Sequence, residues 1–486
     1  MREVRFVFLL LILLVCKGVV AEDLVRVASV EDIVSACEKG ERNLVLKDGE
    51  YKDFQLELSW NGTKQQSLQL KAEHPGKVIL TGNSKIVLSG NHILLSGLDF
   101  NHGKRLEGGA LIFVSGENNR ITQTRLRNYN QVTGVWIQLN GRYNRVDHCW
   151  FEGKTSGASY INVDVPRKGG NHHFVDSNYF SRPPLGRNGG SAMRIGHGSM
   201  AKRYCYTTVE YNLFDDCSGE GEIMSSKSCG NTFRYNTFLN CKGGLSLRQG
   251  VEGIVESNFF ISNKGEKNHC SGVSIRGRKH LVLNNYFYGL APKKGAVISF
   301  GAGSPSDPQR IAKGLIARHF PKTAENVIAH NLFVRNHSLC IDVINDLGHR
   351  NKVIPPDSLC FFDNVLVGAH PLVRKHTQPQ YLLCDNNLYQ GQLGIEQSKG
   401  FQKKRVKLVE KEPMLFTPKN EKVLSIAANA RWTKFLTDEM KQRLDYNLNE
   451  GSSRSGVRFV PDGERGGLQH PFSKTEVGPE WMNLNQ

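Results

Sequence analysis

The chain has 486 residues, with 63 Lys or Arg against 46 Asp or Glu, so its formal net charge is +17. An apolar content of 39% and a charged content of only 22% exclude an intrinsically disordered chain. The lack of a three-residue glycine period excludes collagen. So basic a chain favours polyanionic partners, either acidic polysaccharide or nucleic acid, unless the charge serves solubility alone. We expect no nucleic-acid partner, because the sequence has no tract rich in Lys and Arg.

The first 21 residues are predicted to be a cleavable secretory signal. Arg2 and Arg5 precede an apolar run, Phe6 to Val15, that is too short to span a membrane, and Val19-Val20-Ala21 fits a cleavage site of small residues. No later segment approaches about 18 uninterrupted apolar residues. The sequence therefore predicts an exported chain, secreted or periplasmic, without a membrane span.

From about residue 170 onward, an asparagine followed by two large residues recurs at unequal intervals. The copies are Asn178-Tyr179-Phe180, Asn212-Leu213-Phe214, Asn236-Thr237-Phe238, Asn258-Phe259-Phe260, Asn285-Tyr286-Phe287, Asn331-Leu332-Phe333 and Asn387-Leu388-Tyr389. A constant signature with variable loops is typical of a solenoid. We predict an all-β right-handed parallel β-helix over residues 22–400, with stacked asparagines at one turn and stacked rings inside. A β-propeller is the alternative, but its period should be more regular and about 40 residues or longer.

The cysteines follow the same repeat. Cys205 and Cys229 lie at one position before two successive repeat asparagines, and Cys217 and Cys241 lie at one position after them. Each pair should therefore stack on adjacent coils, either as a disulfide, which export permits, or as buried thiols that act as small apolar residues. The ladder position favours thiols. The sequence contains no Cys-x-x-Cys pair, which argues against a zinc ribbon.

Polar residues that could carry chemistry gather in three neighbouring repeats. Glu220 and Glu222 are two apart, so on a strand both carboxylates would face the same side, and hard oxygen donors of this kind suit calcium. The repeat register places Asn188 one coil before Glu222, Lys227 shortly after it and Arg248 on the next coil. We call these five residues, Asn188, Glu220, Glu222, Lys227 and Arg248, the wall, and we interpret the wall as a functional site. The alternative is a surface salt-bridge cluster.

Three segments of this region together resemble polysaccharide lyase family 6, which contains alginate lyases and chondroitinase B. The segments are Gly-Arg-Asn-Gly-Gly-Ser-Ala-Met-Arg-Ile-Gly (186–196), Gly-Glu-Gly-Glu-Ile-Met-Ser-Ser-Lys-Ser (219–228) and Gly-Leu-Ser-Leu-Arg-Gln-Gly (244–250). The resemblance covers roughly residues 25–390 and includes the opening stretch around Asp48 to Asp53. It implies a calcium-dependent parallel β-helix.

The resemblance also implies a role for each residue of the wall. Asn188, Glu220 and Glu222 match the family's calcium ligands. Lys227 matches the catalytic base, and Arg248 matches the acid or charge-stabilising arginine. Like-charge repulsion from Ca²⁺ and Arg248 should lower the pKa of Lys227, so that the lysine can act as a neutral base.

Two further residues are expected to contact substrate. Gln249 stands where the family usually has histidine, and an amide can hydrogen-bond but cannot carry charge or shuttle a proton. Arg276, on the following coil, resembles an arginine of the alginate-cleaving members and is expected to contact a substrate carboxylate. The alternative for Arg276 is an arginine of a surface ladder.

The sequence thus predicts a secreted, Ca²⁺-dependent lyase that cleaves an anionic uronate polysaccharide, with alginate favoured, by β-elimination at uronate C5 and O4. The alternatives are a dermatan sulfate (chondroitin B) lyase, a polyuronate C5-epimerase and a non-catalytic carbohydrate-binding β-helix. Residues 401–486 are predicted to form an extension, with a short helix in Ala427 to Leu444, that packs on the solenoid and blocks edge pairing. The sequence leaves the oligomeric state open.

Overall fold

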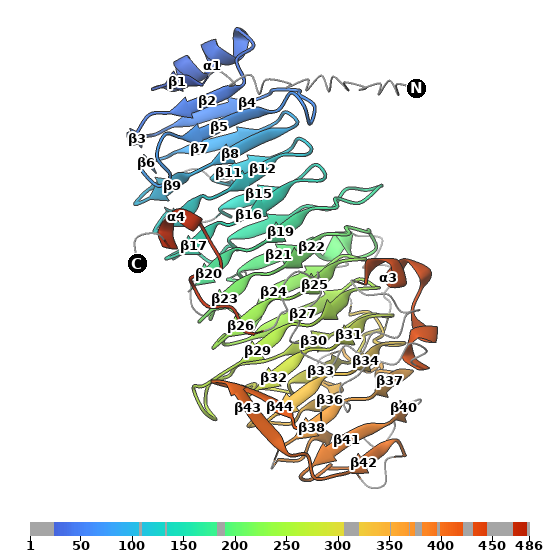
Figure 1. Cartoon of the computed structure of the whole chain (residues 1–486). Helices are drawn as coiled ribbons and strands as arrows, with labels where there is room; N and C mark the ends of the chain where they lie inside the picture. Colours follow the sequence, from blue (N-terminus) through green and yellow to red (C-terminus); the bar gives the residue numbers. More distant parts are fainter. Residues whose placement is uncertain are drawn as a thin grey trace, which may run out of the picture.

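The chain winds into a long solenoid whose coils stack as rungs (Figure 1). This computed structural model describes residues 24–105, 109–131, 134–181, 190–305, 320–349, 351–368, 370–374, 382–395, 399–420, 431–444 and 470–483. The predicted signal, residues 1–21, lies outside the described residues. Each full coil contributes one strand to each of three parallel sheets, which we call A, B and C. The predicted right-handed parallel β-helix is confirmed.

Sheet A has 14 strands. In spatial order they are β1 (Val25–Val27), β2 (Asn43–Leu46), β5 (Leu68–Ala72), β8 (Ile93–Ser96), β12 (Arg120–Thr122), β16 (Arg145–Asp147), β19 (Phe174–Asp176), β22 (Thr208–Glu210), β25 (Thr232–Arg234), β28 (Ile254–Glu256), β31 (Leu281–Leu283), β34 (Val327–Ala329), β37 (Leu359–Phe362) and β40 (Leu382–Asp385).

Sheet B also has 14 strands, and sheet C has 12. Sheet B consists of β3 (Gly49–Lys52), β6 (Val78–Thr81), β9 (Leu98–Asn101), β13 (Arg125–Arg127), β17 (Trp150–Glu152), β20 (Tyr179–Ser181), β23 (Leu213–Asp215), β26 (Thr237–Leu239), β29 (Phe259–Ile261), β32 (Tyr286–Tyr288), β35 (Leu332–Val334), β38 (Val365–Val367), β41 (Asn387–Gln390) and β42 (Phe401–Lys403). Sheet C consists of β4 (Gln55–Leu58), β7 (Lys85–Leu88), β11 (Ile112–Val114), β15 (Ile137–Leu139), β18 (Ile161–Val163), β21 (Met193–Ile195), β24 (Glu222–Lys227), β27 (Gly244–Gln249), β30 (Val273–Ile275), β33 (Ile298–Gly301), β36 (Ile341–Asn345) and β39 (Val373–Arg374).

The remaining elements lie at the start of the solenoid, on its loops and in the tail. They are α1 (Val30–Glu38), β10 (Lys104–Arg105), β14 (Asn130–Gln131), η1 (Gly198–Met200), β43 (Leu408–Glu412), β44 (Leu415–Pro418), η4 (Arg431–Phe435), α3 (Asp438–Arg443) and α4 (Glu480–Asn483). Among the described residues, no helix is both long and apolar enough to cross a membrane.

A ladder of buried asparagines forms the corner between sheets A and B, as the repeat predicts. Each side-chain amide except the last donates to the Oδ1 atom of the asparagine on the next coil, over 2.8–3.0 Å. The residue before each of these asparagines has a left-handed φ of 53–57°. The asparagine bonds therefore hold a tight turn that is unfavourable for residues other than glycine. The ladder comprises Asn178, Asn212, Asn236, Asn258, Asn285, Asn331, Asn364 and Asn387.

Stacked phenylalanines fill the interior beside this corner. Neighbouring rings have centroids 4.6–5.1 Å apart and nearly parallel planes. The column comprises Phe151, Phe180, Phe214, Phe238, Phe260, Phe287 and Phe333. Because side chains alternate along a strand, the residue between each asparagine and its phenylalanine faces outward, so only the second large residue of each repeat is in the column.

Replacing Asn236 by alanine is expected to lower the free energy of unfolding by about 2–4 kcal/mol. The Asn236 amide donates to Val209 O and to Asn258 Oδ1, and its oxygen accepts the Asn212 N–H. The variant leaves buried backbone groups without partners, at a cost of about 1–3 kcal/mol each. Urea denaturation measures the change, and Asn263→Ala, at an exposed loop position, is the control. Equal destabilisation by both variants would contradict a structural role for the ladder.

The ten cysteines among the described residues are free thiols, which confirms the thiol interpretation. Cys217 and Cys241 are buried neighbours on adjacent coils. Burial is the main cause that raises the pKa of the Cys241 thiol, and the contact with Cys217 adds to it. A raised pKa keeps the thiol protonated and unreactive at neutral pH. These cysteines therefore act as small apolar residues of the core.

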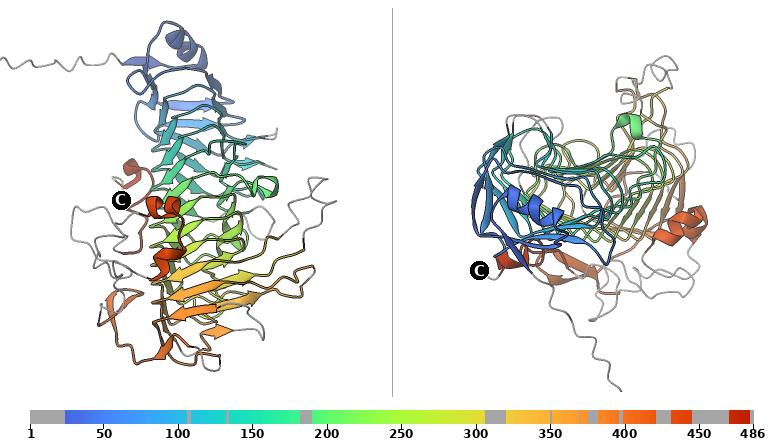
Figure 2. Two further views of the ribbon diagram at one scale, coloured as in Figure 1. Left: turned by 90° about the vertical axis from the view of Figure 1, so that its right-hand side faces the viewer. Right: turned by 90° about the horizontal axis from the view of Figure 1, so that it is seen from above.

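The tail runs along the outside of the solenoid, as its orange and red segments show in Figure 2. The β43–β44 hairpin packs Leu415 and Phe416 on the outer face of sheet B, where Tyr286 Oη donates to Met414 O over 2.9 Å. Trp432 of η4 and Met440 of α3 pack on the outer face of sheet A. In the described part of the predicted helical segment, the structure has η4 and α3 in place of one continuous helix.

The boundary between the solenoid and its extension stays a prediction. Strand β42 still pairs with β41 in parallel, so solenoid pairing continues just past residue 400.

Candidate active site on sheet C

The candidate site lies where β24 and β27 run side by side in sheet C. Both strands have six residues, whereas the flanking strands β21 and β30 have three. The register shifts between the pairs Ser226↔Leu247 and Lys227↔Gln249, which leaves Arg248 as the extra residue of a bulge. Bulges re-aim side chains and are frequent beside active sites. Here the bulge is the local feature that positions Arg248.

Glu222 and Arg248, which the sequence places on one wall, are in direct contact. Arg248 Nη1 donates to Glu222 Oε1 over 2.8 Å, and Ser225 Oγ donates to Glu222 Oε2 over 2.6 Å. Both groups are partly exposed, at 36% for the Arg248 side chain and 18% for Glu222. A charged donor makes the Arg248 hydrogen bond a strong one, and it fixes the direction of both side chains.

Lys227 lies at the end of β24 within the electrostatic reach of the same groups. Burial lowers its pKa most. Arg194 and Arg248 lower the pKa further, while Glu222 and Glu220 oppose the shift. The predicted direction is therefore confirmed, but burial comes before like-charge repulsion as its cause. A lysine with a lowered pKa is a candidate general base.

Repeat spacing and motifs did not single out Arg194, although the sequence contains a signal for it. It lies on β21, opposite Ser225 of β24, and its buried Nε atom has no hydrogen-bond partner among the described residues. The apolar–charged–apolar pattern Met193-Arg194-Ile195 marks it as the outward residue of the coil before Glu222. It adds a third cation to this wall.

Three predicted residues differ from expectation or cannot be placed. Glu220 lies in a bend before β24, not on a strand, so the argument from strand alternation is wrong for it, although its charge still acts on Lys227. Asn188 lies outside the described residues. Gln249 is opposite Lys227 and only 4% exposed, which leaves little of its side chain for a substrate to reach. The substrate-contact role of Gln249 stays a prediction.

Arg276 lies on the coil after Arg248, as predicted, but it is buried. It is 5% exposed and forms an ion pair with Asp346, which also binds Lys352. Such burial contradicts the alternative of a surface ladder arginine. A substrate contact stays a prediction, because Asp346 already neutralises this guanidinium.

Phe320 covers this group of cations. Its ring centroid lies 5.1 Å from the Arg248 guanidinium, 4.9 Å from that of Arg276 and 4.6 Å from Lys352 Nζ. Cations over a ring face are attracted by its quadrupole. Phe320 therefore contacts both Arg248 and the buried Arg276.

An open groove extends from Glu222 across the following coils and has a volume of about 410 Å³. Its floor includes the outward residues Ser246, Ser274 and Ser299 of β27, β30 and β33, which are Cα partners in register. Small hydroxyl side chains leave room for a polymer and can hydrogen-bond to it.

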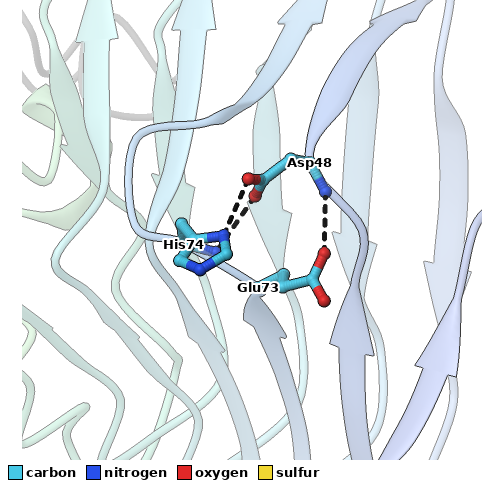
Figure 3. A group of neighbouring side chains, drawn as sticks. All are labelled: Asp48, Glu73 and His74. Atoms are coloured by element: carbon cyan, nitrogen blue, oxygen red, sulfur yellow. Dashed lines mark hydrogen bonds and ion pairs between the residues drawn. The ribbon is translucent and has the colours of Figure 1, made fainter.

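A separate polar cluster lies on the opening coils (Figure 3). In the described part of the chain, Asp48, Glu73 and His74 are the group of three potential metal-ligating side chains whose ligand atoms lie close together. His74 Nδ1 lies 2.7 Å from Asp48 Oδ2, and Arg26 Nε donates to Glu73 Oε1 over 3.0 Å. These contacts explain the cluster as a hydrogen bond beside an exposed ion pair, and exposed pairs contribute little to stability.

Comparison with known proteins identifies the solenoid. Its fold is that of the polysaccharide lyases with a parallel β-helix. The family model described as Chondroitinase B matches residues 25–427, and the chain therefore belongs to the chondroitinase B family. The resemblance to polysaccharide lyase family 6 is confirmed. A search of curated proteins found no match.

Solved structures agree with this family. The family 6 alginate lyase AlyGC is similar with a TM-score of 0.74 and 25% identity, over 91% of this chain and 59% of that one. The chain thus spans less than two thirds of AlyGC. A mannuronic acid specific family 6 lyase from human gut microbiota gives 0.68 and 24%, over 78% of this chain and 90% of that one. A family 6 lyase from Pseudopedobacter saltans gives 0.68 and 20%, over 94% and 99%. The last two, below 25% identity, show the fold alone.

Proposed function

We propose that the chain is an exported, calcium-dependent lyase that cleaves alginate by β-elimination. The observation that carries the proposal is the contact of Glu222 with Arg248 beside Lys227, whose pKa is lowered, in a member of the chondroitinase B family. A polyuronate is favoured as substrate because the wall and its groove carry several cations. Export is proposed from the signal-like residues 1–21.

The chemical difficulty of the reaction is that the uronate C5 proton is only weakly acidic. Lys227, when neutral, would accept this proton. The C4–C5 double bond then forms as O4 leaves with its bonding electrons, and the leaving O4 oxygen takes a proton from water or a tyrosine and becomes a hydroxyl. Arg248 would stabilise the negative charge that develops, because a guanidinium almost never loses its own proton. The product has an unsaturated uronate end.

The described carboxylates fit a calcium site by their chemistry. Glu222 is a partly exposed carboxylate on the open wall, where each oxygen accepts one hydrogen bond and keeps a further lone pair, and Glu220 is near enough to act on Lys227. Hard carboxylate oxygens are the ligands that Ca²⁺ prefers. Glu220 and Glu222 would hold the ion, with Asn188 as the proposed third ligand. Bound there, calcium would supply positive charge that stabilises the carboxylate side of the enolate-like state.

A substrate panel followed by ultraviolet absorbance tests the proposal. We expect alginate to give rising absorbance from unsaturated uronate ends, and a chelator to abolish the rise. Because the family model is that of chondroitinase B, dermatan sulfate is the second substrate. If absorbance rises with dermatan sulfate alone, the substrate is dermatan sulfate and not alginate. NMR of an uncleaved but altered polymer would indicate an epimerase, and binding without turnover would indicate a binding module.

A further inference from the structure

The groove beside Glu222 carries a column of basic side chains along one corner of the solenoid. Lys242 precedes β27, His269 precedes β30, and Lys293 and Lys294 precede β33. These three strands are consecutive neighbours in sheet C, directly after β24. All four side chains are exposed and line the groove. They therefore occupy the same corner of three successive coils.

Among the described residues, no ion pair balances the charge of this column. None of the three lysines forms an ion pair with a carboxylate of the described residues. Glu222 is the acidic residue among the described residues that line the groove, and it already binds Arg248. A cleft lined by charge of one sign focuses its field and concentrates oppositely charged ligands.

The spacing of the column fits an extended chain. Neighbouring strands in a sheet are about 4.8 Å apart, so the coils from β24 to β33 extend over about 14 Å along the solenoid axis. The groove is lined by serines and by Gly243, Gly244 and Gly272, which have small side chains or none. The groove can therefore admit a bulky polymer. The groove thus presents at least one basic side chain on each of the coils of β27, β30 and β33.

The lining favours a glycan over a nucleic acid. Proteins bind single-stranded nucleic acids by stacking bases on aromatic side chains along a basic groove. The described lining residues include no Phe, Tyr or Trp. Hydroxyls and backbone groups beside regularly spaced cations suit a polymer with one anionic group per sugar.

We propose that Lys242, His269, Lys293 and Lys294 form an extended subsite that binds consecutive acidic sugars of the polymer, on the side of Glu222 that faces the later coils. The subsite rests on the proposed function and sets how long a substrate must be for tight binding. Its ligand chemistry is carboxylate or sulfate groups on a glycan. The polymer lies parallel to the solenoid axis over sheet C.

The test compares the double variant Lys293→Gln/Lys294→Gln with the wild-type enzyme on alginate oligosaccharides from disaccharide to hexasaccharide. We expect KM for the hexasaccharide to rise about five- to tenfold at low salt with little change in kcat, since binding that is equal in ground and transition states affects KM. KM for the shortest substrates should change less. Added salt should diminish the difference.

A charge-matched control uses the double variant Lys202→Gln/Lys279→Gln, because both lysines are exposed and lie outside the groove. An equal rise in KM in this control would show a general charge effect and overturn the subsite. An unchanged KM in the double variant, or an equal rise for all lengths, would also overturn it.

Titration calorimetry separates this subsite from the proposed lyase activity. If wild-type protein cleaves no substrate but binds alginate hexasaccharide more tightly than the double variant does, the lyase proposal fails and the subsite stands. If cleavage is normal and both proteins bind equally, the subsite fails and the lyase stands. Dermatan sulfate oligosaccharides in a parallel titration distinguish sulfate from carboxylate recognition.

Discussion

Replacing Lys227 by alanine is expected to reduce kcat for alginate cleavage by about 10²–10⁴-fold, the range for loss of a general acid or base. Oligosaccharide binding measured by calorimetry should persist, because the groove and its basic rim remain. Lys227→Arg should not restore activity, since arginine keeps the charge but cannot give up its proton. This pair of variants separates a base from a positive charge that only binds substrate.

The pH profile of the wild-type enzyme gives a second measure of the same residue. The base must be neutral, so kcat should rise with pH as Lys227 deprotonates. Because burial and the neighbouring arginines lower the pKa of Lys227 below its usual value, this rise should occur below pH 10.5. Lys202→Ala, at an exposed position, should retain wild-type activity and profile. Turnover in Lys227→Ala close to that of this control would eliminate the base assignment.

The solenoid could be predicted because its two ladders repeat the same chemistry on every coil. A buried asparagine that bonds to its successor and a phenylalanine that stacks on the next leave a visible signature in the sequence. The repeat signature does not include Asn364, because the residues that follow it, Val365 and Leu366, are smaller than the aromatic residues of most copies. Its hydrogen bonds to Asn331 and Asn387 nevertheless continue the ladder. The backbone turn requires the asparagine, whereas the core beside it accepts any apolar side chain of suitable volume.

The wall was predictable only where residues follow the coil register. Glu222, Lys227 and Arg248 belong to paired strands of adjacent coils, and their proximity follows from repeat spacing. The environment of Arg276 does not follow from repeat spacing, because its partner Asp346 lies 70 residues away in sequence and comes from the loop after β36. Phe320 likewise lies beyond β33, outside any repeat position. Loop residues of this kind are brought to a site by tertiary packing, which repeat spacing does not encode.

Removing calcium is expected to lower alginate cleavage by at least about 100-fold, because a bound metal contributes several kcal/mol of charge stabilisation to such a transition state. Dialysis against a chelator, followed by return of Ca²⁺ or Mg²⁺, measures the effect. Ca²⁺ should restore activity and Mg²⁺ should not, since Mg²⁺ demands a smaller octahedral site and gives up its water reluctantly. Glu220→Gln should raise the Ca²⁺ concentration needed for activity while it leaves the contact of Glu222 with Arg248 intact.

Thermal unfolding provides a readout of the same site without substrate. A ligand that binds only the folded state stabilises it by about 2.7 kcal/mol at 100 times its Kd, so Tm should rise with added Ca²⁺. The rise should be small in Glu222→Gln. Asp48→Asn, in the polar cluster of the opening coils (Figure 3), is the control and should respond as wild type does. If Asp48→Asn alone lost the response, calcium would bind that cluster, and Glu220 and Glu222 would act on the substrate only through their charge.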